Sequence, residues 1–312
     1  MKDKKVLITG GAGLLGMALT DKLRRMGAKV TSTYHTREPM VRYSNVAYMH
    51  IDLTDEHQID RMLPDCDYMF MCAAVIKGAG SMEGFAVDLQ TPNTVMQALL
   101  LKWALEHKVG KVVFYGSSTS YPETDFPVTE DMMFDGDPYE KYFAVGWYKR
   151  YGEKLCELYN KLGLNVIVLR PSNIYGPHDK FEPERSHVTP ALIRKVIERQ
   201  NPLEVWGDGM DERDLIYVDD AVDASVLAVE KIDGYNPINI GYGSTVSVNE
   251  VLRTLLDIEG FAPEVKYIAD APTMIPKRYI DVSKAERFLG WKAKTTLREG
   301  LEKTLQWYRE NY

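Results

Sequence analysis

The sequence predicts an α/β protein built on a doubly wound parallel sheet, with a smaller, interleaved α+β domain. Two observations carry this prediction. Short apolar runs alternate with longer helical patterns over the first 170 residues, and most of these runs are nearly continuous in apolar or β-branched side chains. Such runs are typical of parallel strands whose two faces are both covered by helices. The alternation breaks down between Pro171 and Pro202, where prolines recur, so the chain is expected to leave the sheet there.

The expected elements follow from local periodicity. Strands of the large sheet are predicted at 5–9, 29–33, 47–51, 68–73, 111–116 and 165–170, and helices at 14–26, 86–107 and 144–162. Beyond them, the patterns indicate helices at 188–199, 248–258 and 297–312 and strands at 203–206 and 215–218. The predicted first domain therefore comprises residues 1–171 and about 215–242, and the second comprises 172–214 and 243–312.

Composition excludes several classes of protein. The 312 residues are 45% hydrophobic and 27% charged, with a net charge of −7, which is ordinary for a globular enzyme. Basic runs are missing, so we expect no nucleic-acid partner, and the longest apolar stretch is too short for a membrane span. The three cysteines are widely spaced, which argues against a disulfide framework or a metal site and for a cytoplasmic protein.

A glycine-rich turn provides the first functional motif. Gly10, Gly13 and Gly16 form G-x-x-G-x-x-G between the first expected strand and a helix that opens with Leu14 and Leu15. Glycines at this spacing permit a tight turn, a close approach of pyrophosphate to the backbone, and close packing of helix on strand. The motif predicts a dinucleotide-binding site; the alternative is a purely structural turn.

The end of the second strand predicts which cofactor binds. A carboxylate there would hold the ribose of NAD, but the first acid is Glu38, and Arg37 with His35 precedes it. We therefore expect NADP, with NAD as the alternative; Arg37 could also be a solvated loop residue. Further cofactor contacts are expected after the third and fourth strands, at Asp52, Leu53, Ala73 and Ala74.

These motifs, with Gly116-Ser117-Ser118, resemble the extended short-chain dehydrogenase/reductases, which have a Rossmann domain. Downstream, Pro-Ser-Asn-Ile-Tyr-Gly-Pro-His-Asp at 171–179, Ser-His-Val-Thr-Pro-Ala-Leu at 186–192 and Val-Trp-Gly-Asp-Gly at 205–209 resemble the GDP-L-fucose synthase family. That family epimerises C3 and C5 of a GDP-linked 4-keto-6-deoxy sugar and then reduces the C4 ketone with NADPH. The resemblance covers nearly the whole chain.

The resemblance implies roles for individual residues. It implies a homodimer formed through helices 86–107 and 144–162. It assigns Lys149, Pro171, Asn173 and Ile174 to the cofactor. It assigns to a GDP-sugar the residues Ser117, Asn173, His187, Val188, Lys195, Trp206, Arg213 and Arg278.

The catalytic positions match the family only in part. Ser117 matches the ketone-binding Ser, and His187 matches an epimerisation acid. The family's Cys partner is replaced by Thr119, whose hydroxyl is a poor base at neutral pH. The family also has Tyr-x-x-x-Lys; Lys149 fits the Lys, but Val145 stands at the Tyr position. Tyr142, seven residues before Lys149, is the alternative source of a phenol.

Three functions remain open at this stage. The first is an NADP-dependent epimerase/reductase for a GDP-linked 4-keto sugar. The second is an epimerase or related sugar-nucleotide enzyme that keeps NAD(P) tightly bound and catalyses no net redox change. The third is a catalytically degraded sensor of the cofactor or of a sugar nucleotide, which the missing tyrosine favours.

Overall fold

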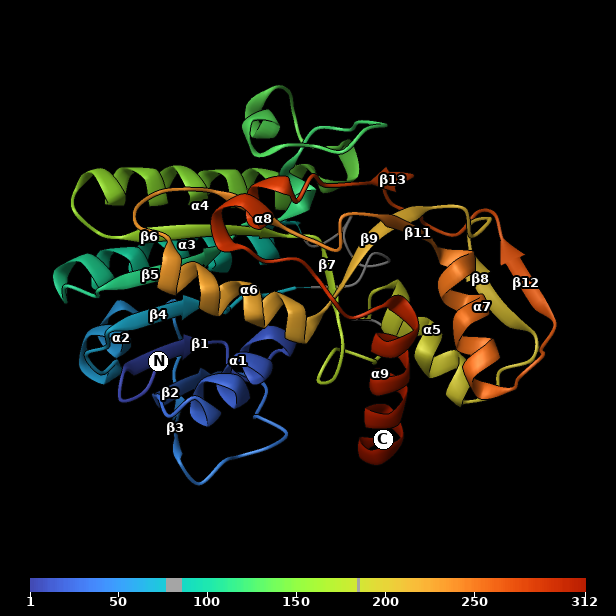
Figure 1. Cartoon of the computed structure of the whole chain (residues 1–312), viewed down its shortest axis with the longest axis horizontal. Helices are drawn as coiled ribbons and strands as arrows, with labels where there is room; N and C mark the ends of the chain where they lie inside the picture. The colour runs from blue at the N-terminus through green and yellow to red at the C-terminus, as the bar shows by residue number, and fades with distance from the viewer. Residues whose placement is uncertain (77–85, 184–185) are drawn as a thin grey trace.

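The computed structural model of the protein describes residues 1–76, 86–183 and 186–312. Its centre is a seven-stranded, entirely parallel sheet in the order β10-β6-β5-β4-β1-β2-β3 (Figure 1). The strands are β1 (Lys5–Thr9), β2 (Lys29–Tyr34), β3 (Val46–His50), β4 (Tyr68–Met71), β5 (Lys111–Tyr115), β6 (Val166–Pro171) and β10 (Ile238–Ile240). The order reverses direction between β1 and β4, as in other doubly wound folds.

Helices cover both faces of this sheet. On one face α1 (Leu14–Arg25) packs against α6 (Val218–Lys231); on the other α3 (Ala86–Glu106) packs between α2 (Glu56–Met62) and α4 (Phe143–Lys161). Successive apolar side chains of β1 point to opposite faces of the sheet, so both faces need to be covered. Val6 and Ile8 join the core under α1 and α6, whereas Leu7 joins the core under α3. Within the described ranges, none of the helices is long and apolar enough to cross a membrane.

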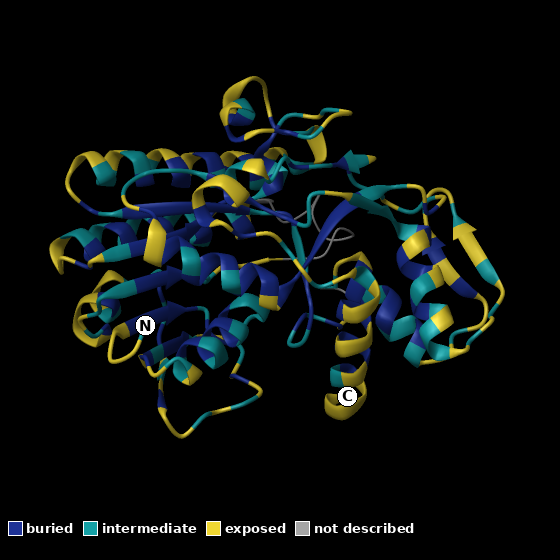
Figure 2. Ribbon diagram, viewed as in Figure 1, coloured by how far each residue is buried: buried dark blue, intermediate teal, exposed yellow. Residues whose placement is uncertain are grey.

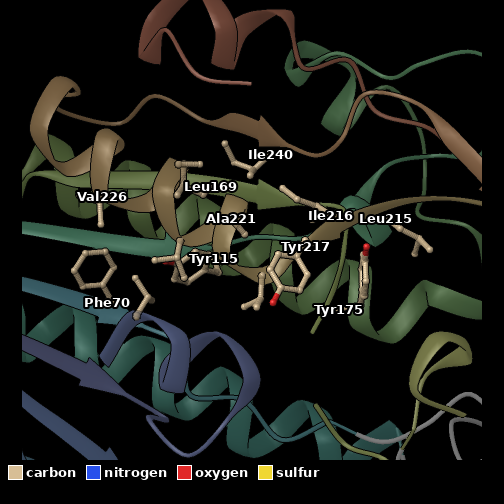
Figure 3. Packing of buried hydrophobic residues seen from close by; sticks show 14 of the residues in the cluster. Phe70, Tyr115, Leu169, Tyr175, Leu215, Ile216, Tyr217, Ala221, Val226 and Ile240 are labelled. Carbon is tan, nitrogen blue, oxygen red and sulfur yellow. The ribbon is translucent and has the colours of Figure 1, made fainter. Parts of the chain in front are cut away.

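The remaining strands form two small sheets. In one, β9 (Glu212–Tyr217) pairs with β7 (Asn173–Tyr175), β11 (Thr245–Ser247) and β13 (Lys277–Arg278); in the other, β8 (Leu203–Trp206) pairs with β12 (Val265–Ile268). The helices beside them are α5 (Val188–Ile197), α7 (Val248–Glu259) and α9 (Leu297–Asn311), while α8 (Ser283–Leu289) packs on α6. Buried side chains run without interruption from the large sheet into β9 (Figures 2 and 3).

The predicted fold class is confirmed. Every expected strand of the large sheet is present, with ends that differ by one or two residues, and so are the expected helices. The sequence analysis missed α2, α8 and the short strands β7, β10, β11, β12 and β13. It placed 215–218 with the large sheet, whereas residues 215–217 lie in β9, whose partners all belong to the smaller sheet.

A buried carboxylate joins the two sheets. Asp214 of β9 accepts hydrogen bonds from the Ser172 hydroxyl at 2.8 Å and from the backbone N–H groups of Tyr242 and Gly243 at 2.8 and 2.9 Å. Ser172 lies between β6 and β7, and Tyr242 lies between β10 and β11. Two of the crossings of the chain between the sheets, from β6 to β7 and from β10 to β11, are therefore held at one side chain.

A buried ion pair holds α4 against the large sheet. The guanidinium of Arg170 in β6 donates to both carboxylate oxygens of Glu153 in α4, at 2.6–3.1 Å, and neither side chain is more than 2% exposed. Arg170 also donates to the Tyr121 hydroxyl at 2.8 Å, and this hydroxyl donates to Asn239 of β10 at 2.6 Å. One connected set of hydrogen bonds thus joins α4, β6, β10 and the segment after β5.

We expect Glu153→Gln to lower the free energy of unfolding by about 3–5 kcal/mol, because it leaves the buried Arg170 charge without its counter-ion. Urea unfolding monitored by circular dichroism measures this change. Glu157→Gln on the same helix is the matched control, because Glu157 pairs only with the exposed Lys154 and Lys161. Equal urea midpoints for the two variants would contradict the role given to the buried pair.

Candidate active site

The glycine turn between β1 and α1 leaves space for a ligand at the helix start. Gly10 has φ +67°, and a Cβ there would lie 2.6 Å from the Ala73 Cα atom. A Cβ on Gly16 would lie 2.4 Å from the Gly10 carbonyl oxygen. Gly13 is different: it is the N-cap of α1, and of the residues that the structure describes its Cβ would meet only that same oxygen, at 3.4 Å. Gly10 and Gly16 therefore shape the turn, and Gly13 leaves the backbone open to approach.

The same turn fits the pyrophosphate of a dinucleotide. The first turn of α1 begins with the uncharged Leu14 and Leu15, and Gly13 has no side chain with which to cap its N–H groups. These N–H groups and the positive end of the helix dipole favour a negatively charged ligand. When bound, a nicotinamide dinucleotide would supply hydride chemistry, and these residues would hold its pyrophosphate.

Two of the residues predicted to contact the adenosine, Arg37 after β2 and Asp52 after β3, interact with residues of their own loops. The Arg37 guanidinium contacts the Met40 sulfur at 3.4 Å. Burial of the His178 imidazole lowers its pKa to about 4, and the positive charge of Arg37 adds to this shift. Asp52 accepts hydrogen bonds from the Thr54 hydroxyl and N–H at 2.7 and 2.8 Å, which lower the pKa of its carboxyl group. The remaining predicted contacts here are His35, which is exposed, and Leu53, which is buried.

The segment after β4 is fixed at both ends of its described part. The Ala73 N–H donates to the Thr9 hydroxyl at 3.3 Å, while Ala74 is exposed. Asn93 of α3 then makes two hydrogen bonds of 2.9 Å with the backbone of Val75. Ala73 therefore lies directly beside Gly10, at the carboxyl edge of β1 and β4.

The hydroxyl pair after β5 is formed as a unit. The Ser117 and Thr119 hydroxyl oxygens are 2.7 Å apart, and the Thr119 N–H donates to the Ser117 oxygen at 3.1 Å. Thr119, at the position of the family's Cys, is thus hydrogen-bonded to the residue expected to bind a ketone. The pair lies at the carboxyl edge of the large sheet, as the glycine turn does.

Lys149 points toward the same strand end. Its amine donates to the Tyr115 carbonyl oxygen at 2.6 Å. Burial lowers the pKa of Lys149 to about 8, and the negative charge of Glu153 opposes this shift. Val145 lies one helical turn before Lys149 and presents only methyl groups, so α4 supplies no phenol at that place.

His187 lies at the N-cap position of α5, with Val188 as the first helical residue, and both side chains are exposed. Desolvation by the surrounding protein is the main cause that lowers the pKa of the His187 imidazole, and the positive charge of Lys180 adds to this shift. Among the described residues, no hydrogen bond joins His187 to Ser117 or Thr119. The structure therefore does not assemble these three into a proton relay by themselves.

Predicted substrate contacts divide between two places. Lys195 of α5 donates to the Glu204 carbonyl oxygen of β8 at 2.6 Å, two residues from Trp206, which is 47% exposed. Arg213 and Arg278 are register partners on β9 and β13 and are at least nine-tenths buried. The resemblance also implies three cofactor contacts at the β6–β7 junction. They are Pro171, Asn173 and Ile174, and all three are half-buried.

Sequence reasoning missed several residues that shape this region. A Cβ on Gly11 would lie 1.7 Å from the Ser32 hydroxyl, so this glycine is as constrained as its neighbours; the Gly-Gly pair was the available signal. Asn93 and Asp214 gave no signal of their own, because their partners are distant in sequence.

A comparison with protein families decides the classification. The family model described as "NAD dependent epimerase/dehydratase family" matches residues 6–241. The chain belongs to this family. The protein is accordingly an NAD(P)-dependent enzyme of the epimerase/dehydratase type, in agreement with the short-chain dehydrogenase/reductase resemblance seen in its motifs.

Relatives extend over the full length. A probable GDP-L-fucose synthase 1 of Oryza sativa subsp. japonica is 33% identical, covering 99% of this chain and 93% of the relative. GDP-L-fucose synthase of Escherichia coli (strain K12) is 30% identical, covering 100% and 98%. Among solved structures, the UDP-glucose 4-epimerase of Thermotoga maritima has a TM-score of 0.89 at 29% identity, covering 98% and 99%. A GDP-6-OMe-4-keto-L-xylo-heptose reductase from C. jejuni has a TM-score of 0.88 at 25% identity, covering 100% and 99%.

We expect Gly13→Ala to weaken NAD(P)H binding by roughly tenfold or more, which corresponds to at least about 1.4 kcal/mol. The added methyl group would occupy the space through which pyrophosphate reaches the backbone. The backbone of Gly13 is extended (φ −85°), so the urea midpoint of unfolding should change little. Fluorescence titration of the cofactor measures the affinity.

Gly10→Ala is the comparison for this prediction. Its positive φ and the close Ala73 backbone mean that the fold itself should be destabilised. Unchanged cofactor affinity in the Gly13→Ala protein would show that the pyrophosphate does not bind at this turn.

Proposed function

We propose that the protein is an NADP-dependent epimerase/reductase that acts on a GDP-linked 4-keto sugar. The observation that carries the proposal is the pair of buried guanidinium groups, Arg213 and Arg278, side by side on adjacent strands. Two such groups suit a diphosphate, which accepts charge-assisted hydrogen bonds from arginine. Trp206, exposed on β8, would stack on the base.

The choice of guanine rests on the relatives. Curated proteins named GDP-L-fucose synthase match nearly the whole chain at 33% and 30% identity, and the C. jejuni reductase named above acts on a GDP-linked sugar. The T. maritima epimerase was solved with UDP-glucose. GDP is therefore favoured over UDP by the nearer sequence relatives, and the segment 171–192 that resembles the synthase family supports the same choice.

The division of labour between the two parts of the chain belongs to the proposal. Residues 1–171, with part of 215–242, would bind the dinucleotide, because the candidate cofactor contacts follow strands of the large sheet. Residues 172–214 and 243–312 would bind the sugar nucleotide, because Trp206, Arg213 and Arg278 lie on the small sheets.

The proposed chemistry assigns a task to each polar side chain. A 4-keto group acidifies the neighbouring C–H bonds, so His187 can remove and return a proton there. The hydroxyls of Ser117 and Thr119 would donate to the ketone oxygen. Reduction would need a hydride at C4, which a bound nicotinamide cofactor would supply, and a proton at O4, which would come from water because α4 offers no phenol at position 145.

Lys149 would bind the ribose next to the nicotinamide. Its ammonium form makes that contact, and the pKa of about 8 is below the ordinary value for lysine. The contact is therefore fully present well below pH 8 and is lost as the pH rises through that value. Val145 contributes no proton, so C4 reduction should be slow compared with enolisation at C3 or C5.

We also propose a homodimer. Apolar side chains are exposed on one face of α4, at a spacing that aligns them within a single stripe. They are Phe143, Trp147, Tyr151, Leu158 and Leu162. A second copy of the chain packed on this stripe would cover an otherwise solvated apolar surface.

The preference for NADP depends on Arg37. Removing a charge-assisted hydrogen bond to the 2′-phosphate costs about 1.5–3 kcal/mol, so Arg37→Ala should weaken NADPH binding roughly 10- to 100-fold and leave NADH binding nearly unchanged. Fluorescence titration with both cofactors measures this. Arg42→Ala is the matched control in the same loop, since Arg42 pairs with Tyr34 and Glu38. Equal losses for NADPH and NADH would remove the basis for the assignment.

The reaction itself is tested with GDP-4-keto-6-deoxymannose, NADPH and heavy water. We expect deuterium at one ring carbon or none, and slow NADPH oxidation, because Thr119 replaces a better base and Val145 replaces a phenol. General acid–base catalysis contributes roughly 10²–10⁴-fold, so Val145→Tyr should accelerate reduction within that range. Mass spectrometry and absorbance at 340 nm follow the two processes.

Val145→Phe controls for the added ring, since it brings the same bulk without a hydroxyl. Deuterium exchange without NADPH oxidation in any variant would favour the epimerase that catalyses no net redox change. Absence of both exchange and oxidation with GDP-, UDP- and dTDP-linked 4-keto sugars would favour the sensor, the candidate that the valine at position 145 supports.

A further inference from the structure

The segment just before α4 reaches across to the smaller sheet. The Lys141 amine donates to the Thr273 carbonyl oxygen at 2.5 Å, in the segment that leads into β13. The Tyr142 N–H donates to the Tyr139 carbonyl oxygen at 2.7 Å, which closes a single 3₁₀ turn. Residues of the large-sheet part thereby lie against the strand that bears Arg278.

Pro138, the residue just before this turn, holds the turn against α4. Pro138 packs directly on Gly146 of α4, where an added Cβ would lie 2.4 Å from the proline ring. The same Cβ would lie 3.3 Å from the Thr119 carbonyl oxygen, so the glycine at 146 lets both Pro138 and the Thr119 backbone approach α4 closely. The contact with Pro138 therefore holds the turn at one place along α4.

The two arginines opposite this turn are oriented by backbone oxygens. Arg213 donates to the Pro276 carbonyl oxygen at 3.2 Å and to the Asp211 carboxylate at 3.1 Å. Arg278 donates to the Tyr121 and Pro122 carbonyl oxygens at 3.2 and 3.0 Å. Among the described residues, the Nε atom of Arg278 is buried without a hydrogen-bond partner.

Tyr142 lies close enough to these arginines for their charges to act on its phenol. Burial raises the pKa of this phenol, and the charges of Arg213 and Arg278 oppose that shift. The Tyr139 ring contacts it edge to face at 5.9 Å between centroids. No hydrogen bond between described residues uses the Tyr142 hydroxyl, so this donor is available to a ligand held by the two guanidinium groups.

The helix geometry separates Tyr142 from the reacting centre. It precedes Lys149 by seven residues, which is about 10 Å along a helix, whereas a residue four positions before Lys149 is about 6 Å away. A phenol at Tyr142 is therefore about one helical turn further from Lys149 than the family's tyrosine would be. The charged groups that act on it are Arg213, Arg278 and the Asp211 carboxylate, and their net positive charge suits an anionic ligand better than a ketone.

Building on the function proposed above, we propose that the hydroxyl of Tyr142 donates a hydrogen bond to the diphosphate of the sugar nucleotide, together with Arg213 and Arg278. Tyr142 is then a substrate-binding residue supplied by the cofactor-binding part of the chain, and not a displaced proton donor. A phenol donating to a phosphate oxygen forms a charge-assisted hydrogen bond, which is among the stronger kinds. The substrate would thus be held from both parts of the molecule.

The test compares Tyr142→Phe with Tyr139→Phe, which removes a hydroxyl from the same turn. Calorimetry with GDP should show roughly 10- to 100-fold weaker binding for Tyr142→Phe, the loss expected for a hydrogen bond to a charged group. GMP, which lacks the β-phosphate, should lose less. NADPH affinity and kcat should be retained while KM rises, and Tyr139→Phe should resemble the unmodified protein.

The possible outcomes separate the two proposals. Unchanged GDP affinity in Tyr142→Phe, with kcat lowered 100-fold or more, would make Tyr142 the proton donor and overturn the inference. Unchanged affinity and unchanged kcat would overturn it as well. If the unmodified protein binds UDP or dTDP more tightly than GDP, the guanine assignment fails and the comparison is run with that nucleotide. If it binds none of the three, the proposed function itself fails.

Discussion

The buried ion pair between Arg170 and Glu153 is the interaction on which the arrangement of the candidate site depends. It joins β6 to α4 and continues through Tyr121 to β10. Gly116 packs directly on it: a Cβ there would lie 2.4 Å from a carboxylate oxygen of Glu153. Position 116, just before Ser117, must therefore be glycine, because a side chain there would collide with the ion pair. The hydroxyl pair, the lysine of α4 and the end of β6 take their relative positions from this one contact.

Burying two charges is costly unless their remaining hydrogen-bonding capacity is used. Here each nitrogen of the guanidinium donates at least one hydrogen bond, and Nη1 also donates to the Glu130 carbonyl oxygen at 2.7 Å. The same carboxylate influences the chemistry one helical turn away, because its negative charge raises the pKa of Lys149 against the lowering caused by burial. A contact that holds the fold together thus also sets the protonation of a residue proposed to bind the cofactor.

The large sheet and its glycine turn could be predicted because their signals are local: continuous apolar strands, and glycines at positions where Cβ atoms would collide. The strands β11, β12 and β13 could not, since they are two to four residues long, and only Arg278 among their residues is buried. Candidate residues that follow strands of the parallel sheet could be placed together from topology alone. The location of Tyr142 could not, because it depends on the contact of Lys141 with Thr273, which is distant in sequence, and on the packing of Pro138 against Gly146.

Asp214 has a mechanical consequence. Its carboxylate receives hydrogen bonds from two of the connections between the sheets, so it would be the natural pivot of any rotation between them. A rotation of one sheet relative to the other about this point would displace atoms in proportion to their distance from it. Asn173, in the strand that follows Ser172, would hardly move, whereas Trp206 on the outer two-stranded sheet would sweep through a longer arc. If the sugar nucleotide binds as proposed, such a rotation would shift the contact with the base more than the contacts near the cofactor.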